Sequence, residues 1–153
     1  MYNYCVYKLY IVVYILDSGI SADNKKKLSD VCERYHYHEL IWIPVQDIRD
    51  EISMKVTIDR GSPSQYARLF VSSALPKTLS RVLYLDCDVI INRSVSGLWN
   101  IDLNGKIVGA LMDAYSKYYR RNIGLQPDDI MFNSGVMLID LEKWRRQDTE
   151  KNL

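Results

Sequence analysis

Two carboxylates separated by one residue, Asp86 and Asp88, directly follow the apolar run at residues 82–85. A short apolar run is typical of a buried strand, and open α/β sheets bind their ligands at the carboxyl ends of strands. In an extended backbone alternate side chains point to the same side, so both carboxylates can converge on one hard divalent cation while Cys87 faces away. Such a cation would in turn hold a phosphate or diphosphate, which two carboxylates alone would repel.

The elements that must position this pair alternate between strand and helix along the chain. This alternation predicts an α/β fold with a mostly parallel central sheet and flanking helices. Strands are expected at residues 10–16, 40–45, 81–85, 106–112 and 135–139. Helices are expected to begin at Ser21, Ser62 and Leu141.

The helix that begins at Ser62 has the best-marked start, because Pro63 stands at its first position and Gln65 completes a capping box. We expect it to end before Pro76 and to bury four side chains, those of Tyr66, Leu69, Phe70 and Ser73. The helix from Ser21 should expose its lysines at 25–27. Its buried face should carry Leu28, Val31, Cys32 and Tyr35.

Composition limits the classes of function. With 153 residues, of which 48% are hydrophobic, the chain is expected to form a single domain over residues 1–153. The net charge of +1 gives no basic surplus for nucleic acid. The three cysteines include no C-x-x-C pair, which favours a reducing, cytoplasmic setting without a disulfide framework or structural zinc. The apolar stretch at 6–16 is interrupted by Lys8 and is too short to span a membrane, so we interpret it as a strand.

Several segments, taken in order, carry a family resemblance: Tyr14–Asp17 with Gly19–Ser21, Tyr66–Leu69, Val82–Val89, Leu98-Trp99, Asn133–Asp140 and Lys143–Arg145. Together they resemble glycosyltransferase family 8, which includes bacterial lipopolysaccharide galactosyl- and glucosyltransferases, glycogenin and plant galacturonosyltransferases. The resemblance implies a Rossmann-like nucleotide-diphospho-sugar transferase fold of the GT-A type. It also implies retaining transfer of a hexose from a UDP-sugar to a glycan or lipid-linked saccharide, as in lipopolysaccharide biosynthesis.

The same resemblance implies roles for individual residues. Asp86 and Asp88 would hold Mn²⁺ or Mg²⁺, with Asp86 also near the ribose. Arg68 would reach the diphosphate or the donor sugar, and its planar guanidinium suits phosphate oxygens. Asp113 and Asn133 match positions that contact the hydroxyls of the donor sugar.

The chain also departs from the pattern of complete family members. The first strand with its base-binding loop, a later Asp-Gln segment and a His-x-x-Gly-x-x-Lys-Pro-Trp motif with the third metal ligand have no counterpart. His36 and His38 lie far in sequence from the acidic pair and are not expected to replace that ligand. We therefore expect a partial domain, truncated at both ends, with weak metal affinity and little turnover by itself.

Two alternatives remain open from the residues. An apolar strand followed by Asp-x-Asp also begins haloacid-dehalogenase-like phosphatases, in which Asp86 would be the nucleophile and Asp88 the general acid or base. A non-catalytic remnant or binding module is the second alternative, and an incomplete sheet edge would favour self-association. For the transferase, we expect a cytoplasmic protein that is peripheral to the inner face of the membrane.

Overall fold

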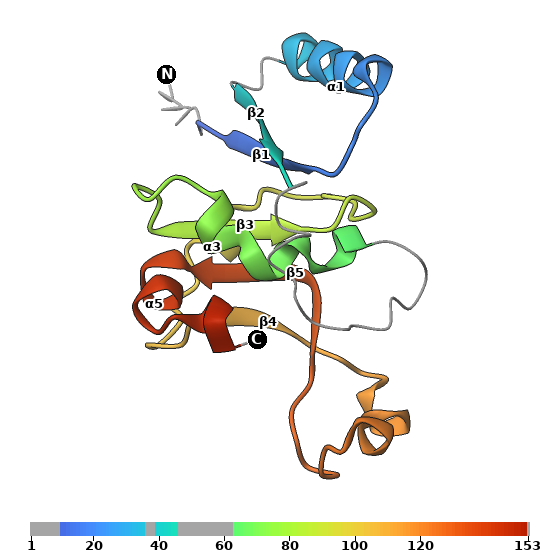
Figure 1. Cartoon of the computed structure of the whole chain (residues 1–153), viewed down its shortest axis with the longest axis vertical. Helices are drawn as coiled ribbons and strands as arrows, with labels where there is room; N and C mark the ends of the chain where they lie inside the picture. Colours follow the sequence, from blue (N-terminus) through green and yellow to red (C-terminus); the bar gives the residue numbers. More distant parts are fainter. Residues whose placement is uncertain (1–9, 36–38, 46–62, 153) are drawn as a thin grey trace, which may run out of the picture. The chain divides into compact units, whose positions relative to one another are not determined.

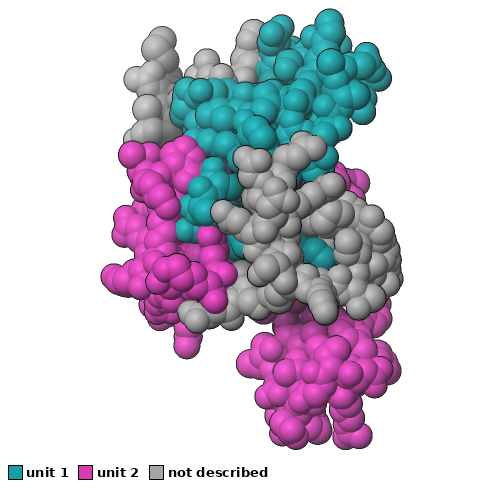
Figure 2. Space-filling model, in the orientation of Figure 1, with its two compact units in different colours: residues 1–74 teal, residues 75–153 magenta. Residues whose placement is uncertain are grey.

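The computed structural model describes residues 10–35, 39–45 and 63–152. The chain divides into two compact units, residues 1–74 and 75–153 (Figure 2). Both units lie inside the single domain predicted over residues 1–153, which stays a prediction. Within the described residues, no helix is both long and apolar enough to cross a membrane.

The first unit contains a β-α-β arrangement, as its alternating pattern predicts. Strand β1 (Val12–Asp17) pairs in parallel with β2 (Glu39–Pro44), and helix α1 (Ala22–Arg34) connects them (Figure 1). The helix begins where the sequence predicts, because the Ser21 hydroxyl accepts a hydrogen bond from the Asn24 amide at 3.3 Å. This part of the fold carries the parallel pairing expected from the strand-helix alternation.

The apolar face of α1 is more exposed than the sequence predicts. Leu28, Val31 and Tyr35 are 41%, 47% and 64% exposed, and α1 has no buried residue. The two strands that this helix connects form a narrow two-stranded sheet, which offers little surface to cover a helix face. The expected burial of this face is therefore wrong for the described residues.

The helix predicted to begin at Ser62 is mostly a 3-10 helix and not an α-helix. It consists of a 3-10 helix, η1 (Pro63–Phe70), followed by one α-helical turn, α3 (Val71–Ala74). Its expected cap, Ser62, lies outside the described residues. The buried side chains here are Ala67, Val71, Ser72 and Leu75, instead of Tyr66, Leu69, Phe70 and Ser73. A 3-10 helix has three residues per turn, so the inward face shifts from the one that an α-helical period predicts.

The second unit is built on a three-stranded sheet in the order β3-β5-β4 (Figure 1). Its strands are β3 (Arg81–Leu85), β4 (Val108–Met112) and β5 (Phe132–Asp140), and β5 runs antiparallel to both neighbours. The antiparallel strand β5 is an exception to the parallel direction that strand-helix alternation predicts and that β1 and β2 have. The chain leaves β4 at its carboxyl end and returns along the same edge, since the Asp113 amide donates to the Met131 carbonyl at 2.9 Å. A connection that returns to the end it left gives an antiparallel pair.

The core of this unit lies between β5 and the last α-helix. Met137, Leu138 and Ile139 on β5 are buried, as are Leu141 and Trp144 on α5 (Leu141–Arg146). Four short helices complete the second unit: α4 (Ser96–Trp99), η2 (Ser116–Tyr118), η3 (Arg120–Ile123) and η4 (Thr149–Asn152). The central strand of the sheet is thus the main scaffold for whatever lies at its ends.

Candidate functional site

Asp86 lies directly beyond the last residue of β3, as the sequence predicts. Its amide donates to the Gly135 carbonyl at 2.8 Å, so the pairing with β5 continues one residue past the strand. Its Oδ1 accepts a hydrogen bond from the Tyr84 hydroxyl at 2.7 Å. Both the main chain and one carboxylate oxygen of Asp86 are therefore held by neighbours.

Asp88 lies in a turn and not in a continued strand. The Val89 amide donates to the Asp86 carbonyl at 3.2 Å, which closes a turn over Cys87 and Asp88, and both of these residues are exposed. The alternation of side chains that was expected to align Asp86 with Asp88 therefore stops at Asp86. Asp88 is available to solvent on this turn, two residues from a carboxylate that is fixed.

A bulge in β5 brings Asn133 to Asp86. On β4 the neighbours Ala110 and Leu111 pair with Met137 and Asn133, so three residues of β5 lie between partners that are adjacent on β4. The Gly135 amide, inside this bulge, donates to Asn133 Oδ1 at 2.8 Å. Bulges of this kind are common beside active sites, because they redirect side chains at a strand end.

The space above Gly135 shows how close the two side chains are. A Cβ atom on Gly135 would lie 3.0 Å from Asn133 Oδ1 and 3.0 Å from Asp86 Oδ2. One amide oxygen and one carboxylate oxygen therefore face the same small gap at the end of β3. Oxygen atoms of this type suit a hard divalent cation or the hydroxyl groups of a sugar.

Asp113 follows β4 and is engaged in its own turn. Its Oδ1 accepts from the Tyr115 amide at 2.8 Å, and its Oδ2 accepts from the Tyr119 hydroxyl. The Tyr119 hydroxyl, and after it the Tyr115 amide, lower the pKa of Asp113, while the same bond raises the pKa of Tyr119. Asp113 thus remains a carboxylate that caps the turn leading into η2, and its contact with a donor sugar stays a prediction.

Arg68 belongs to the first unit, where it lies half-buried on η1. The other predicted site residues, Asp86, Asp88, Asp113 and Asn133, all belong to the second unit. The structure brings Asp86 and Asn133 together, whereas the predicted role of Arg68 at the diphosphate stays a prediction.

Asp17 is a buried carboxylate that the sequence analysis did not single out. Its Oδ1 accepts from the amides of Gly19 and Ile20 at 3.0 and 2.7 Å, and its Oδ2 forms an ion pair with Lys25. The Lys25 ammonium, followed by the two amides, lowers the pKa of Asp17 from 3.8 to about 2. Lys25 also lies 5.3 Å from the centre of the Trp42 ring, so it is not part of a merely solvated face. The sequence does contain a signal for this contact, because Asp17 is an acid at the end of a predicted strand and Gly19 follows it in a turn.

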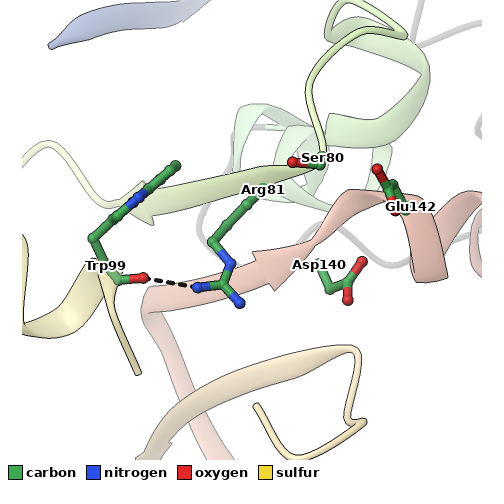
Figure 3. Close-up of a pocket in the computed structure, with 5 residues that line it drawn as sticks. All are labelled: Ser80, Arg81, Trp99, Asp140 and Glu142. Carbon is green, nitrogen blue, oxygen red and sulfur yellow. Dashed lines mark hydrogen bonds between the residues drawn. The ribbon is translucent and has the colours of Figure 1, made fainter. Parts of the chain in front are cut away.

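A pocket of about 420 Å³ lies at the opposite end of β3 (Figure 3). Arg81, the first residue of that strand, lines it, and its Nη1 donates to the Trp99 carbonyl at 2.8 Å. The other lining residues are Ser80, Trp99, Asp140 and Glu142. Because Asp86 follows the last residue of β3, this pocket is separate from the predicted site.

The residues at the Asp86 end of the sheet fit a divalent cation by their donor chemistry. Carboxylate and amide oxygens are the ligands that Mg²⁺ and Mn²⁺ prefer, and the gap above Gly135 is open to two of them. Among residues 10–35, 39–45 and 63–152 there is no cluster of three or more His, Cys, Asp or Glu side chains that could hold a metal. The weak metal affinity expected from the sequence therefore stays a prediction.

Comparison with known proteins identifies relatives for almost the whole chain. General stress protein A of Bacillus subtilis is 28% identical over 146 residues, which are 92% of this chain and 49% of that protein. The lipopolysaccharide 1,2-glucosyltransferase of Escherichia coli is 36% identical over 86 residues, which are 54% of this chain and 25% of that protein. The chain thus spans about half, or less, of the length of these relatives.

A crystal structure of the galactosyltransferase LgtC, in complex with donor and acceptor sugar analogs, superposes with a TM-score of 0.78. It is 33% identical, and the match covers 94% of this chain and 52% of LgtC. The predicted GT-A type of fold is confirmed by this likeness, and the phosphatase alternative is not supported. The family model of glycosyl transferase family 8 matches residues 4–153. The chain belongs to glycosyltransferase family 8.

Proposed function

We propose that this chain carries the donor-binding part of a hexosyltransferase that uses a UDP-sugar. The observation that carries the proposal is the approach of Asn133 to Asp86 across Gly135, at the carboxyl end of a sheet strand. The reaction proposed is transfer of the hexosyl group to a glycan or a lipopolysaccharide-type acceptor with retention of configuration. The relatives named as glucosyl- and galactosyltransferases support this class of reaction.

In this proposal each site residue has a defined task. Asp86 and Asp88 hold Mn²⁺ or Mg²⁺, and Asp86 also lies near the ribose. A cation held there would neutralise the charge that develops on the leaving diphosphate. Asn133 and Asp113 hydrogen-bond the hydroxyls of the donor sugar, and Arg68 donates to the diphosphate through its planar fork.

We further propose that the 153-residue chain alone turns over slowly. It spans about half of the Bacillus relative, and its described residues supply two acids at the strand end instead of three clustered ligands. A site that stays wet stabilises developing charge far less than a closed one. We propose that the protein acts in the cytoplasm, peripheral to the inner face of the membrane. We also propose that it self-associates through an open edge of its sheet.

Calorimetric titration with UDP in the presence of Mn²⁺ tests the donor site. We expect Asp86→Asn and Asp88→Asn each to weaken binding by at least about tenfold, as loss of metal-site residues commonly does. The matched control is Asp128→Asn, because Asp128 is an exposed acid to which the proposal gives no part in the site. Equal affinity of all three variants and the unaltered chain would overturn the proposal.

Turnover is measured separately as UDP released from a UDP-hexose with Mn²⁺ and a saccharide acceptor. Slow release together with Mn²⁺-dependent UDP binding supports a donor-binding part with little activity of its own. Rapid release would refute the expected low turnover but keep the donor site. Size-exclusion chromatography with and without UDP and Mn²⁺ reports on self-association in the same samples.

A further inference from the structure

We infer that Tyr84 and Gly135 are positioning residues for Asp86. The Tyr84 hydroxyl fixes one oxygen of the carboxylate, and Gly135 keeps open the gap that the other oxygen shares with the Asn133 amide. The inference rests on the proposed function, since it gives both residues a part in donor binding. Neither residue would contact the cation. Both would act by holding the Asp86 carboxylate in the orientation that binds it.

The Tyr84 contact is set by the strand. Residues 84 and 86 are two apart, so their side chains emerge on the same side of the extended chain. The hydroxyl donates to Asp86 Oδ1 at 2.7 Å, an ordinary distance for a well-formed O–H···O hydrogen bond. The Asp86 main chain is already held by the bond from its amide to the Gly135 carbonyl. The Tyr84 hydroxyl therefore restricts the one remaining freedom, the rotation of the Asp86 side chain.

Gly135 is required by space and not by backbone conformation. The glycines with positive φ in the described residues are Gly19, Gly105 and Gly124, so the backbone of Gly135 could be adopted by alanine. A Cβ there would lie 3.0 Å from Asp86 Oδ2, 3.0 Å from Asn133 Oδ1 and 3.6 Å from Asp86 Cγ. Both side chains would have to move by a few tenths of an ångström, which approaches the tolerance of about 0.5 Å for a working site.

Two variants separate these contributions, each with a matched control. Tyr84→Phe removes only the hydroxyl, and its control is Tyr35→Phe, because Tyr35 is 64% exposed at the end of α1. Gly135→Ala fills the gap, and its control is Gly97→Ala, because a Cβ on Gly97 would meet nothing within 4 Å. Each pair makes the same chemical change at a site residue and at a residue that has no assigned part in the site.

The 153-residue chain is titrated with Mn²⁺ in the presence of UDP, and electron paramagnetic resonance detects the free and the bound Mn²⁺. We expect Tyr84→Phe and Gly135→Ala each to raise the Mn²⁺ dissociation constant by about tenfold or more, in the range for residues that orient metal ligands. The line shape of bound Mn²⁺ should also change, because its ligand geometry changes. Both controls should bind as the unaltered chain does, and thermal unfolding should show that all four variants are folded at the temperature of the titration.

The outcomes distinguish this inference from the proposed function. If the unaltered chain binds no Mn²⁺ with UDP, the proposed function fails. If it binds, and both site variants bind as tightly as their controls with the same line shape, the positioning inference fails while the proposed function stands. If the loss of affinity is explained by unfolding of both site variants at the temperature of the titration, their role is purely structural and the inference is also overturned.

Discussion

Replacing Ile139 by alanine tests whether β5 is the scaffold of the candidate site. Ile139 is 0% exposed on the central strand, where it pairs with Val82 of β3 and with Val108 of β4. The change removes three carbon atoms, each worth about 0.8 kcal/mol when buried. The neighbouring strands limit collapse of the cavity, so we expect the free energy of unfolding to fall by about 3 to 4 kcal/mol.

Urea unfolding followed by tryptophan fluorescence measures this cost, because Trp144 on α5 is buried in the same core. Ile139→Val, which removes one carbon, should cost about 0.5 to 1.5 kcal/mol. Ile90→Ala is the matched control, since Ile90 is 91% exposed, and it should cost less than about 0.5 kcal/mol. A loss below about 1 kcal/mol for Ile139→Ala would refute the assignment of β5 as the core strand.

Three further predictions follow from local contacts. The pKa of Asp17 is lowered from 3.8 to about 2, so its contribution to stability is complete above pH 3.8 and is lost as the pH falls toward 2. Asp17→Asn should therefore unfold at a lower temperature at pH 6 and approach the unaltered chain near pH 2, and a constant difference would contradict this. Tyr119→Phe removes the main cause of the lowered pKa of Asp113, so carboxyl NMR should show that pKa rising, and an unchanged value would contradict the contact. Gly109→Ala places a Cβ 2.7 Å from Leu103 Cδ2 and should cost about 1 to 3 kcal/mol in urea unfolding, whereas an equal result for Gly97→Ala would argue against tight packing.

The elements with purely local signals could be predicted from the sequence. Strand β3 has the predicted bounds, because its apolar run ends at an acid, and α1 begins where Ser21 caps it. The direction of β5 could not be predicted in the same way. It depends on where the chain returns after residues 113–131, and that return is fixed by the bond between Asp113 and Met131. Strand-helix alternation carries no information about such a distant contact.

In the candidate site, too, local sequence predicts some features, whereas others depend on contacts between distant residues. Asp86 could be predicted from its place after an apolar run, but its proximity to Asn133 was implied only by the family resemblance. The physical cause is the three-residue bulge in β5. The order of apolar and polar residues within 132–140 does not predict this bulge. Gly135 is the one local trace of it, because a residue without a side chain is what allows Asp86 and Asn133 to share a gap. A glycine at the start of a predicted strand therefore marks a place where the backbone and two side chains can approach closely.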